Sequence, residues 1–119
     1  VSEFRARGQS VFVNLTADWC ITCMTNEKLA LSRSSVLKTF SEQKIAYLEG
    51  DWTNSDPRIT ALLRKFNRSG VPLYLLYPAD TTLKPMILPQ ILTQTIILDA
   101  IEELREKEAA LLINADSMN

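Results

Sequence analysis

Two cysteines with Cys-x-x-Cys spacing, Cys20 and Cys23, end an apolar segment that begins at Phe12. The segment reads Phe-Val-Asn-Leu-Thr-Ala-Asp-Trp-Cys-Ile-Thr-Cys and holds the only two cysteines of the chain. Residues three apart share one face of a helix, so two thiols in a first helical turn can close a small disulfide ring and open it again. The segment therefore predicts a strand that leads into a helix, with redox chemistry at the junction.

The composition sets the size of the domain. At 119 residues and 46% hydrophobic, the chain can bury one core, and we expect a single domain over residues 1–119. The 13 basic and 14 acidic side chains give a net charge of -1, which indicates no electrostatic surface for nucleic acid or for an anionic membrane. We expect a monomer.

Neither a membrane span nor a leader is visible. No apolar run approaches the roughly 20 residues that cross a bilayer, and the first residues lack the pattern of a signal peptide. We expect a soluble domain that does not itself insert into a membrane. Because the chain begins at Val1 rather than Met, we also expect that it is excised from a longer protein.

The absence of histidine removes several chemistries. A Ser–His or Cys–His nucleophile pair, a His general base and a His-ligated metal are all excluded. Two cysteines cannot complete a four-thiolate zinc site, and a disulfide-stapled domain of this size usually carries more than one pair. A static disulfide and inert buried thiols stay open as structural alternatives, but the residues favour a reactive pair.

Apolar periodicity predicts helices and strands that alternate along the chain. We expect helices in 1–8, 20–31, 34–40, 57–66 and 97–111, and strands in 11–15, 45–49, 73–77 and 83–88, the last of them short or at an edge. Gly50 is expected to end the second strand, and Asp56 to cap the helix that Pro57 opens. Thr93 or Thr95 would cap the last helix, and residues 114–119 would form a frayed tail.

This order predicts the fold class. A strand–helix–strand start, a later hairpin and a final helix give an α/β domain whose central mixed sheet is flanked by helices on both faces. With Cys-x-x-Cys at the end of the first strong strand, the layout is that of a thioredoxin-like fold.

Three segments carry a resemblance to a known family. They are Thr-Ala-Asp-Trp-Cys-Ile-Thr-Cys at 16–23, Asp-Trp-Thr-Asn at 51–54 and Arg-Ser-Gly-Val-Pro-Leu-Tyr at 68–74. Over about residues 12–92 the chain resembles the C-terminal thioredoxin-like domain of the bacterial transmembrane thiol:disulfide interchange reductases of the DsbD/ScsB type. Trp-Cys-x-x-Cys with a later Val-Pro is specific for the thioredoxin superfamily, and Asp-Trp-Thr-Asn and Leu-Pro-Gln-Ile-Leu-Thr point to the narrower group.

The resemblance implies a function and a location. The domain would be a protein-disulfide reductase on the periplasmic face of the bacterial inner membrane, a soluble part of a membrane protein. It would take electrons from the membrane domain and pass them to a periplasmic protein disulfide, with a link to cytochrome c biogenesis. The redox group would be the Cys20–Cys23 disulfide itself, with no metal or organic cofactor.

The residues of the motif suggest individual roles. The helix dipole and free N–H groups favour a thiolate at Cys20, which would attack a partner disulfide, and Cys23 would resolve the mixed disulfide. The family's proline before the third strand is cis and beside the disulfide, which implies that Pro72 shapes the partner groove and leaves the Val71 backbone to pair with an extended partner segment. Glu27 lies on the same helix side as both thiols and could raise their pKa values or relay a proton, although an ordinary solvated glutamate fits equally.

Two positions depart from the family pattern. Asn14 stands where relatives commonly have a buried aspartate that assists proton transfer to the second cysteine, and an amide cannot accept that proton. Met24 stands where relatives often have Lys, and Asp18 adds a negative charge, so both changes argue against an extremely acidic Cys20 and favour a reducing role. Trp19 is expected to shield the site and contact partners, and Trp52 to do the same or to belong to the core.

Two other functions stay open. One is an oxidase or isomerase of the same fold. The other is a Cu(I)-binding or copper-resistance module that uses Cys20, Cys23 and Met24, since two thiolates can hold Cu(I). Copper carriers usually place Met two residues before the first Cys, where this chain has Asp18.

Overall fold

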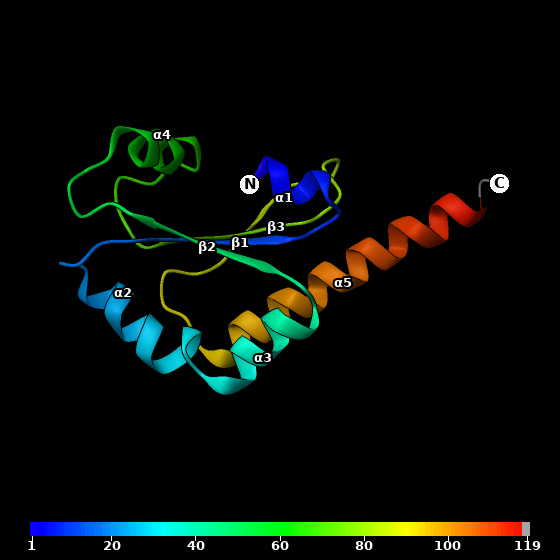
Figure 1. Cartoon of the computed structure of the whole chain (residues 1–119), viewed down its shortest axis with the longest axis horizontal. Coiled ribbons are helices and arrows are strands. Elements are labelled where there is room, and N and C mark those ends of the chain that lie inside the picture. Colours follow the sequence, from blue (N-terminus) through cyan, green and yellow to red (C-terminus); the bar gives the residue numbers. More distant parts are fainter. Residues whose placement is uncertain (118–119) are drawn as a thin grey trace.

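The computed structural model describes residues 1–117, with side chains described as far as Leu111. Its elements are α1 (Ser2–Ala6), β1 (Val11–Thr16), α2 (Ile21–Asn26), the π-helix η1 (Glu27–Leu31), α3 (Ser34–Glu42), β2 (Ala46–Asp51), α4 (Pro57–Lys65), β3 (Leu73–Tyr77), β4 (Met86–Ile87) and α5 (Gln94–Ser117). The predicted α/β architecture is confirmed, with helices on both faces of one sheet (Figure 1). Within the described residues, no helix is both long enough and apolar enough to cross a bilayer.

The sheet is mixed and has the strand order β2-β1-β3-β4. β1 pairs in parallel with β2 and antiparallel with β3, and β3 pairs antiparallel with β4. Residues 11–15 of β1 are buried, as expected for a β-branched and aromatic strand covered on both faces. The predicted central strand is therefore confirmed, while the strand expected in 83–88 is reduced to the two residues of β4.

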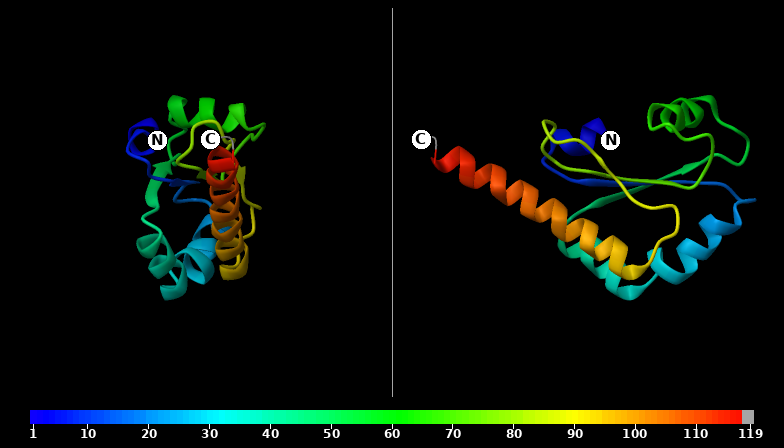
Figure 2. Two further views of the ribbon diagram at one scale, coloured as in Figure 1. Left: turned by 90° about the vertical axis from the view of Figure 1, so that its right-hand side faces the viewer. Right: turned by 180° about the vertical axis from the view of Figure 1, so that it is seen from behind.

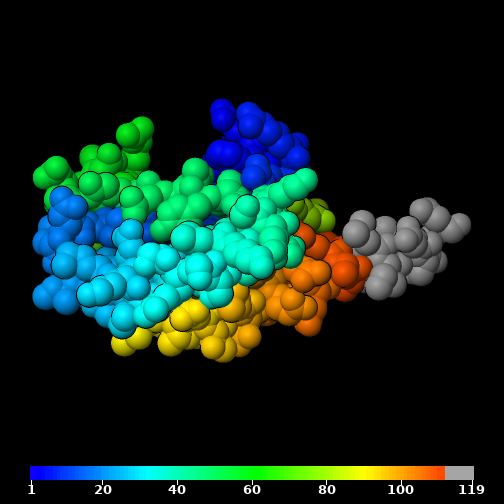
Figure 3. Space-filling view, turned by 60° about the horizontal axis from the view of Figure 1, so that its bottom comes forward, coloured from blue at the N-terminus to red at the C-terminus, as the bar shows by residue number. Residues whose placement is uncertain are grey.

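The sheet has α1 and α4 on one face and α2, α3 and α5 on the other (Figure 1, Figure 2). Because successive side chains of a strand point to opposite faces, the sheet separates two cores. Phe12 packs on the side of η1, α3 and α5, whose apolar stripe includes Ile97 and Leu104. Val11 and its alternate neighbours in β1 pack on the other side against Leu63 of α4. In the space-filling view α3 and α5 form one continuous layer (Figure 3). The carboxyl end of β1, where the cysteines follow, thus emerges between the two layers.

Two predicted boundaries are wrong. Gly50 does not end the second strand, because β2 continues to Asp51. A Cβ at position 50 would lie 2.6 Å from Cδ2 of Leu15, so this glycine makes room for the core and does not mark a turn. The tail expected at 114–119 is helical as far as Ser117, and its last two residues lie outside the described part. At the other end of α5, the Ile96 N–H donates to Thr93 Oγ1 at 3.1 Å, which confirms the expected cap.

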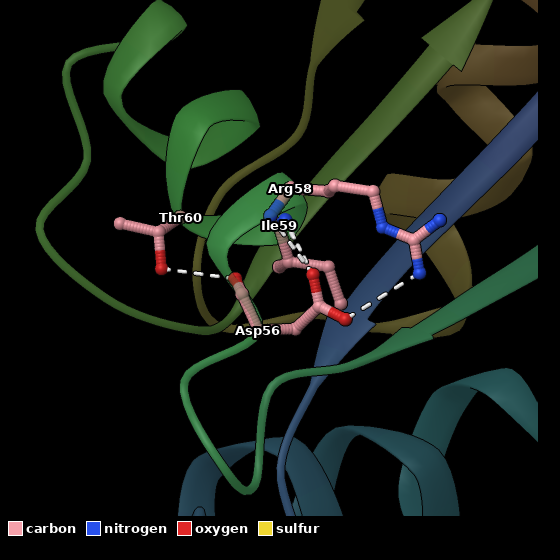
Figure 4. Close-up of polar contacts among 4 residues, drawn as sticks. All are labelled: Asp56, Arg58, Ile59 and Thr60. Atoms are coloured by element: carbon pink, nitrogen blue, oxygen red, sulfur yellow. Dashed lines mark hydrogen bonds and ion pairs between the residues drawn. The ribbon is translucent and has the colours of Figure 1, made fainter.

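The predicted cap of α4 is also confirmed (Figure 4). Oδ1 of Asp56 accepts hydrogen bonds from the N–H groups of Arg58 at 2.8 Å and Ile59 at 3.4 Å. The Thr60 hydroxyl donates to the Asp56 carbonyl at 3.0 Å, and Pro57 occupies the first turn. The backbone hydrogen bonds hold the pKa of Asp56 below its usual range. The cap fixes the point where the chain leaves the loop beside the cysteines and enters α4.

Candidate active site

Cys20 and Cys23 form a disulfide at the start of α2, with their Cα atoms 5.2 Å apart. Cys20 is the N-cap of the helix, and its Sγ accepts a hydrogen bond from the Cys23 N–H at 3.1 Å. The N–H groups of a first turn have no partner within the helix, so they favour negative charge at the capping atom. The predicted position of Cys20 at the helix N-terminus is confirmed.

The sulfurs are enclosed while their neighbours are open to solvent. Cys20 and Cys23 are 6% and 3% exposed. Ala17 and Val71 pack against them, and the Val71–Pro72 peptide bond is cis, as predicted. Around this pair, the large apolar side chains of Trp19, Ile21 and Met24 are exposed by 57%, 76% and 55%. We call these three the apolar ring.

Trp19 is held by hydrogen bonds to a second loop. Its indole Nε1–H donates to the Thr53 carbonyl at 3.1 Å, and the N–H of Asp18 donates to Thr53 Oγ1 at 2.8 Å. Thr53 in turn donates through its hydroxyl and its N–H to Oδ1 of Asp51, which holds the pKa of Asp51 below its usual range. The Asp-Trp-Thr turn after β2 therefore braces the segment that precedes Cys20.

Trp52 lies between Trp19 and the core, so the predicted core position is confirmed. Its ring centroid lies 5.9 Å from that of Trp19, and it also packs against the core on the α4 side of the sheet. Its Nε1–H donates to Thr60 Oγ1 at 2.8 Å. Trp52 thus links the apolar ring to the body of the domain.

Asn14 lies in β1 on the face of the sheet that Phe12 occupies, since the two residues are two apart. It is 2% exposed, its Nδ2 donates to the Tyr47 hydroxyl at 2.8 Å, and its Oδ1 has no hydrogen-bond partner. Although 39% of Tyr47 is exposed, burial raises the pKa of its phenol to about 12. The pair is therefore neutral at physiological pH, and the amide offers no base to a neighbouring thiol.

Glu27 is exposed and opens η1, so the α-helical spacing that relates it to both thiols ends just before it. Burial raises the pKa values of Tyr47, Glu49 and Tyr74, and the negative charge of Glu27 raises them further. Glu49 pairs in register with Asn14. One carboxylate, that of Glu49, thus belongs to the residue that pairs with Asn14.

Asn26 is a residue of this region that sequence reasoning missed. It is 2% exposed, and its Nδ2 donates to the Tyr74 hydroxyl at 2.8 Å and to the Gln90 carbonyl at 2.7 Å. Its Oδ1 accepts from the Leu92 N–H at 3.0 Å. The side chain therefore ties the end of α2 to β3 and to the segment before α5. Asn26 follows Cys23 by three residues, so an asparagine on the same face of the helix as the second cysteine was the available signal.

The described residues hold no group of three or more His, Cys, Asp or Glu side chains arranged to bind a metal. Surface hollows of about 430–570 Å³ lie between β4 and α5, beside α1, and along α5, and a cysteine lines none of these.

Comparison with known proteins gives one family and several relatives. A family model described as thioredoxin-like matches residues 1–79. The thiol:disulfide interchange protein DsbD of Yersinia pestis (strain Pestoides F) is 33% identical over 76 residues, which is 64% of this chain and 12% of that protein. DsbD of Haemophilus influenzae (strain PittEE) is 37% identical over 65 residues, or 55% of this chain and 11% of that protein. The chain thus spans about an eighth of the length of these curated relatives.

Among solved structures, the oxidised C-terminal domain of Neisseria meningitidis DsbD superposes with a TM-score of 0.68. The sequences are 21% identical, and the match covers 86% of this chain and 84% of that domain. At this identity the likeness concerns the fold, which agrees with the architecture expected from the order of helices and strands.

Proposed function

Since this chain belongs to the thioredoxin-like family, we propose that it is a protein-disulfide reductase domain that works through Cys20 and Cys23. The observation that carries the proposal is the disulfide at the N-cap of α2, where Cys20 Sγ accepts a helix N–H and the exposed residues of the apolar ring adjoin the buried cysteines in the sequence. The redox group is the cysteine pair itself, so the reaction uses no metal or organic cofactor.

The reaction is two successive thiol–disulfide exchanges. In the reduced domain the Cys20 thiolate attacks one sulfur of a partner disulfide, which forms the mixed disulfide and breaks the partner's S–S bond, and the departing partner sulfur takes a proton. The Cys23 sulfur, after losing its proton, attacks Cys20, closes the Cys20–Cys23 disulfide and releases the second partner thiol. Two electrons pass from the domain to the partner, and a dithiol of the electron donor restores the reduced state by the reverse sequence.

Four neighbouring residues would support these steps. We assign the groove wall to Trp19 and Asp18, and the backbone pairing with an extended partner segment to Val71, whose side chain packs against the cysteines. Pro72, which is buried and directly precedes β3, is assigned the shaping of that groove. Because the Asn14 amide cannot accept a proton, the proton of Cys23 passes to Glu27 or to water.

The relatives suggest where the domain works. They are named as thiol:disulfide interchange proteins, and this chain corresponds to 12% of the first of them. We propose that residues 1–119 are one domain of a longer membrane protein, monomeric and facing the periplasm of a bacterium. Electrons would come from the membrane domain and go to a periplasmic protein disulfide, including those of cytochrome c biogenesis.

Trapping tests the mechanism. Cys23→Ser should accumulate a mixed disulfide through Cys20 when the reduced variant meets a protein disulfide, whereas Cys20→Ser should accumulate none. Mass spectrometry of non-reduced samples identifies the linked residue. Trapping through neither cysteine would exclude the exchange mechanism.

Two further measurements separate the alternatives. Equilibration with glutathione should show a reducing pair, and a strongly oxidising one would favour an oxidase or isomerase. Titration of the reduced domain with Cu(I) would favour the copper module only if binding were tight and stoichiometric and Met24→Ala weakened it.

A further inference from the structure

The turn after β2 reaches the loop that precedes the cysteines because β1 and β2 end together. The two strands pair in parallel as far as Thr16 and Asp51, and the Trp52 N–H then donates to the Thr16 carbonyl at 2.7 Å. The next residue, Thr53, lies at the end of β1. It therefore meets residues 18 and 19 of the active-site segment, 35 positions earlier in the sequence.

The hydrogen bonds at Thr53 run in one direction. The Asp18 N–H donates to Thr53 Oγ1 at 2.8 Å, and the same hydroxyl donates to Oδ1 of Asp51. A hydroxyl has one hydrogen and an ionised carboxylate has none, so the chain can only run from Asp18 through Thr53 to Asp51. Because the final acceptor is charged, these bonds are stronger than bonds between neutral groups.

The backbone of Thr53 holds the other end of the same segment. Its carbonyl accepts the Trp19 Nε1–H at 3.1 Å, while the indole ring remains 57% exposed and tilts against Trp52. One residue of the second loop thus fixes both the backbone before Trp19 and the orientation of its indole. An exposed aromatic side chain held in this way contacts a partner without losing rotamer freedom on binding.

We infer that Thr53 is a positioning residue that presents the Trp19 indole as a fixed wall for the partner protein beside Cys20. This inference rests on the proposed reductase function. Thr53 acts through Asp18 and Trp19. It therefore affects the docking of a protein segment more strongly than it affects the chemistry of the sulfurs. A disulfide in a folded partner needs the wall, whereas a small disulfide does not.

Thr53→Val tests the inference, because valine keeps the shape of threonine but removes the hydroxyl that both accepts and donates. We expect the second-order rate constant for reduction of insulin, the protein disulfide used as probe, to fall about five- to tenfold, the effect of losing the one hydrogen bond that the hydroxyl makes to the active-site segment, from the Asp18 N–H. Thr53→Ser keeps the hydroxyl and should stay within about twofold of the wild type. The rate with a small aryl disulfide should change by less than about twofold in both variants, since that substrate docks against no wall.

The fluorescence emission of Trp19 reports directly on the environment of its indole. The emission of Trp19, taken as the difference between each protein and its Trp19→Phe counterpart, should shift to longer wavelength in Thr53→Val and return in Thr53→Ser. Urea denaturation verifies that the variants are folded. If Thr53→Val does not fold, Asp51→Ala removes the final acceptor instead and should give the same selective loss with insulin.

Three results would overturn the inference. They are a Thr53→Val variant that reduces insulin as fast as the wild type, a Thr53→Ser variant as slow as Thr53→Val, and equal slowing with the small disulfide. If the wild type reduced neither substrate, the proposed function would fail. The Trp19 emission would still decide the positioning role, and an unchanged spectrum in Thr53→Val would refute it.

Discussion

Replacing the buried Asn26 by alanine should destabilise the domain strongly, because one side chain satisfies groups on two segments, β3 and the stretch before α5. The substitution leaves the Leu92 N–H and the Tyr74 hydroxyl, both bonded in buried surroundings, without their partner. At about 1.5 kcal/mol for each buried group left unsatisfied, the free energy of unfolding should fall by about 3 kcal/mol. The Gln90 carbonyl lies nearer the surface, where water replaces the lost bond at smaller cost.

This loss is large for a domain of this size. Stabilities are commonly about 5–15 kcal/mol, so about 3 kcal/mol removes a substantial share of the total. With a melting temperature that shifts by about 4 °C per kcal/mol, the midpoint should fall by about 12 °C. Urea and thermal denaturation of the oxidised protein, followed by far-ultraviolet circular dichroism, measure both quantities.

Two controls make the measurement decisive. Asn54→Ala removes an exposed asparagine side chain and should change the free energy of unfolding by less than about 0.5 kcal/mol. Asn26→Asp keeps an oxygen for the Leu92 N–H, and its protonated carboxyl can replace one donor, so its loss of stability should shrink as the pH falls. A loss below about 1 kcal/mol for Asn26→Ala would refute the reasoning, because it would mean that water or repacking satisfies both buried groups.

Two further predictions concern the ends of β2 and α4. Gly50→Ala should lower the free energy of unfolding by about 1–3 kcal/mol through overpacking, because the new Cβ would lie 2.6 Å from Leu15. Gly70→Ala is the control, since its Cβ would lie 3.6 Å from Trp52, which is an ordinary contact. Equal urea midpoints for the two variants would contradict this. The pKa of Asp56 is lowered in the native state. Its carboxylate therefore stabilises the native state fully when the pH is above the unfolded-state pKa of about 3.9. This stabilisation is lost as the pH falls through the lower native-state pKa. Asp56→Asn retains an oxygen acceptor but does not titrate. The difference in stability between wild type and variant should therefore shrink below about pH 4. A difference that does not depend on pH would be inconsistent with the cap.

The features that the sequence predicted correctly depend on neighbours in the chain. The buried strand around Phe12 follows from a local apolar run, the Cys20–Cys23 pairing from a spacing of three, and the cap of α4 from the Asp56-Pro57 dipeptide. Such signals need no knowledge of the tertiary structure, because the interacting groups are within one turn of helix or one strand.

The features that it missed depend on residues far apart in the sequence. Asn26 meets Leu92 across 66 positions and Thr53 meets Asp18 across 35, and no periodicity encodes such pairings. Gly50 was misread because a glycine resembles a strand terminator unless the close approach of Leu15 is known. The π-helical turn at Glu27–Leu31 likewise follows from packing, so the orientation of Glu27 relative to the thiols could not be derived from helical spacing alone.

The two cysteines are buried while the apolar ring beside them is exposed. This difference determines which molecules reach the cysteines. Cysteine residues that are 6% and 3% exposed present little target to small oxidants that collide at random. A protein that covers Trp19, Ile21 and Met24 displaces water from the ring and brings its own disulfide to the same point. In the proposed function, the electron pair of the reduced cysteines is therefore protected from small diffusing oxidants and passes to a protein docked on the ring.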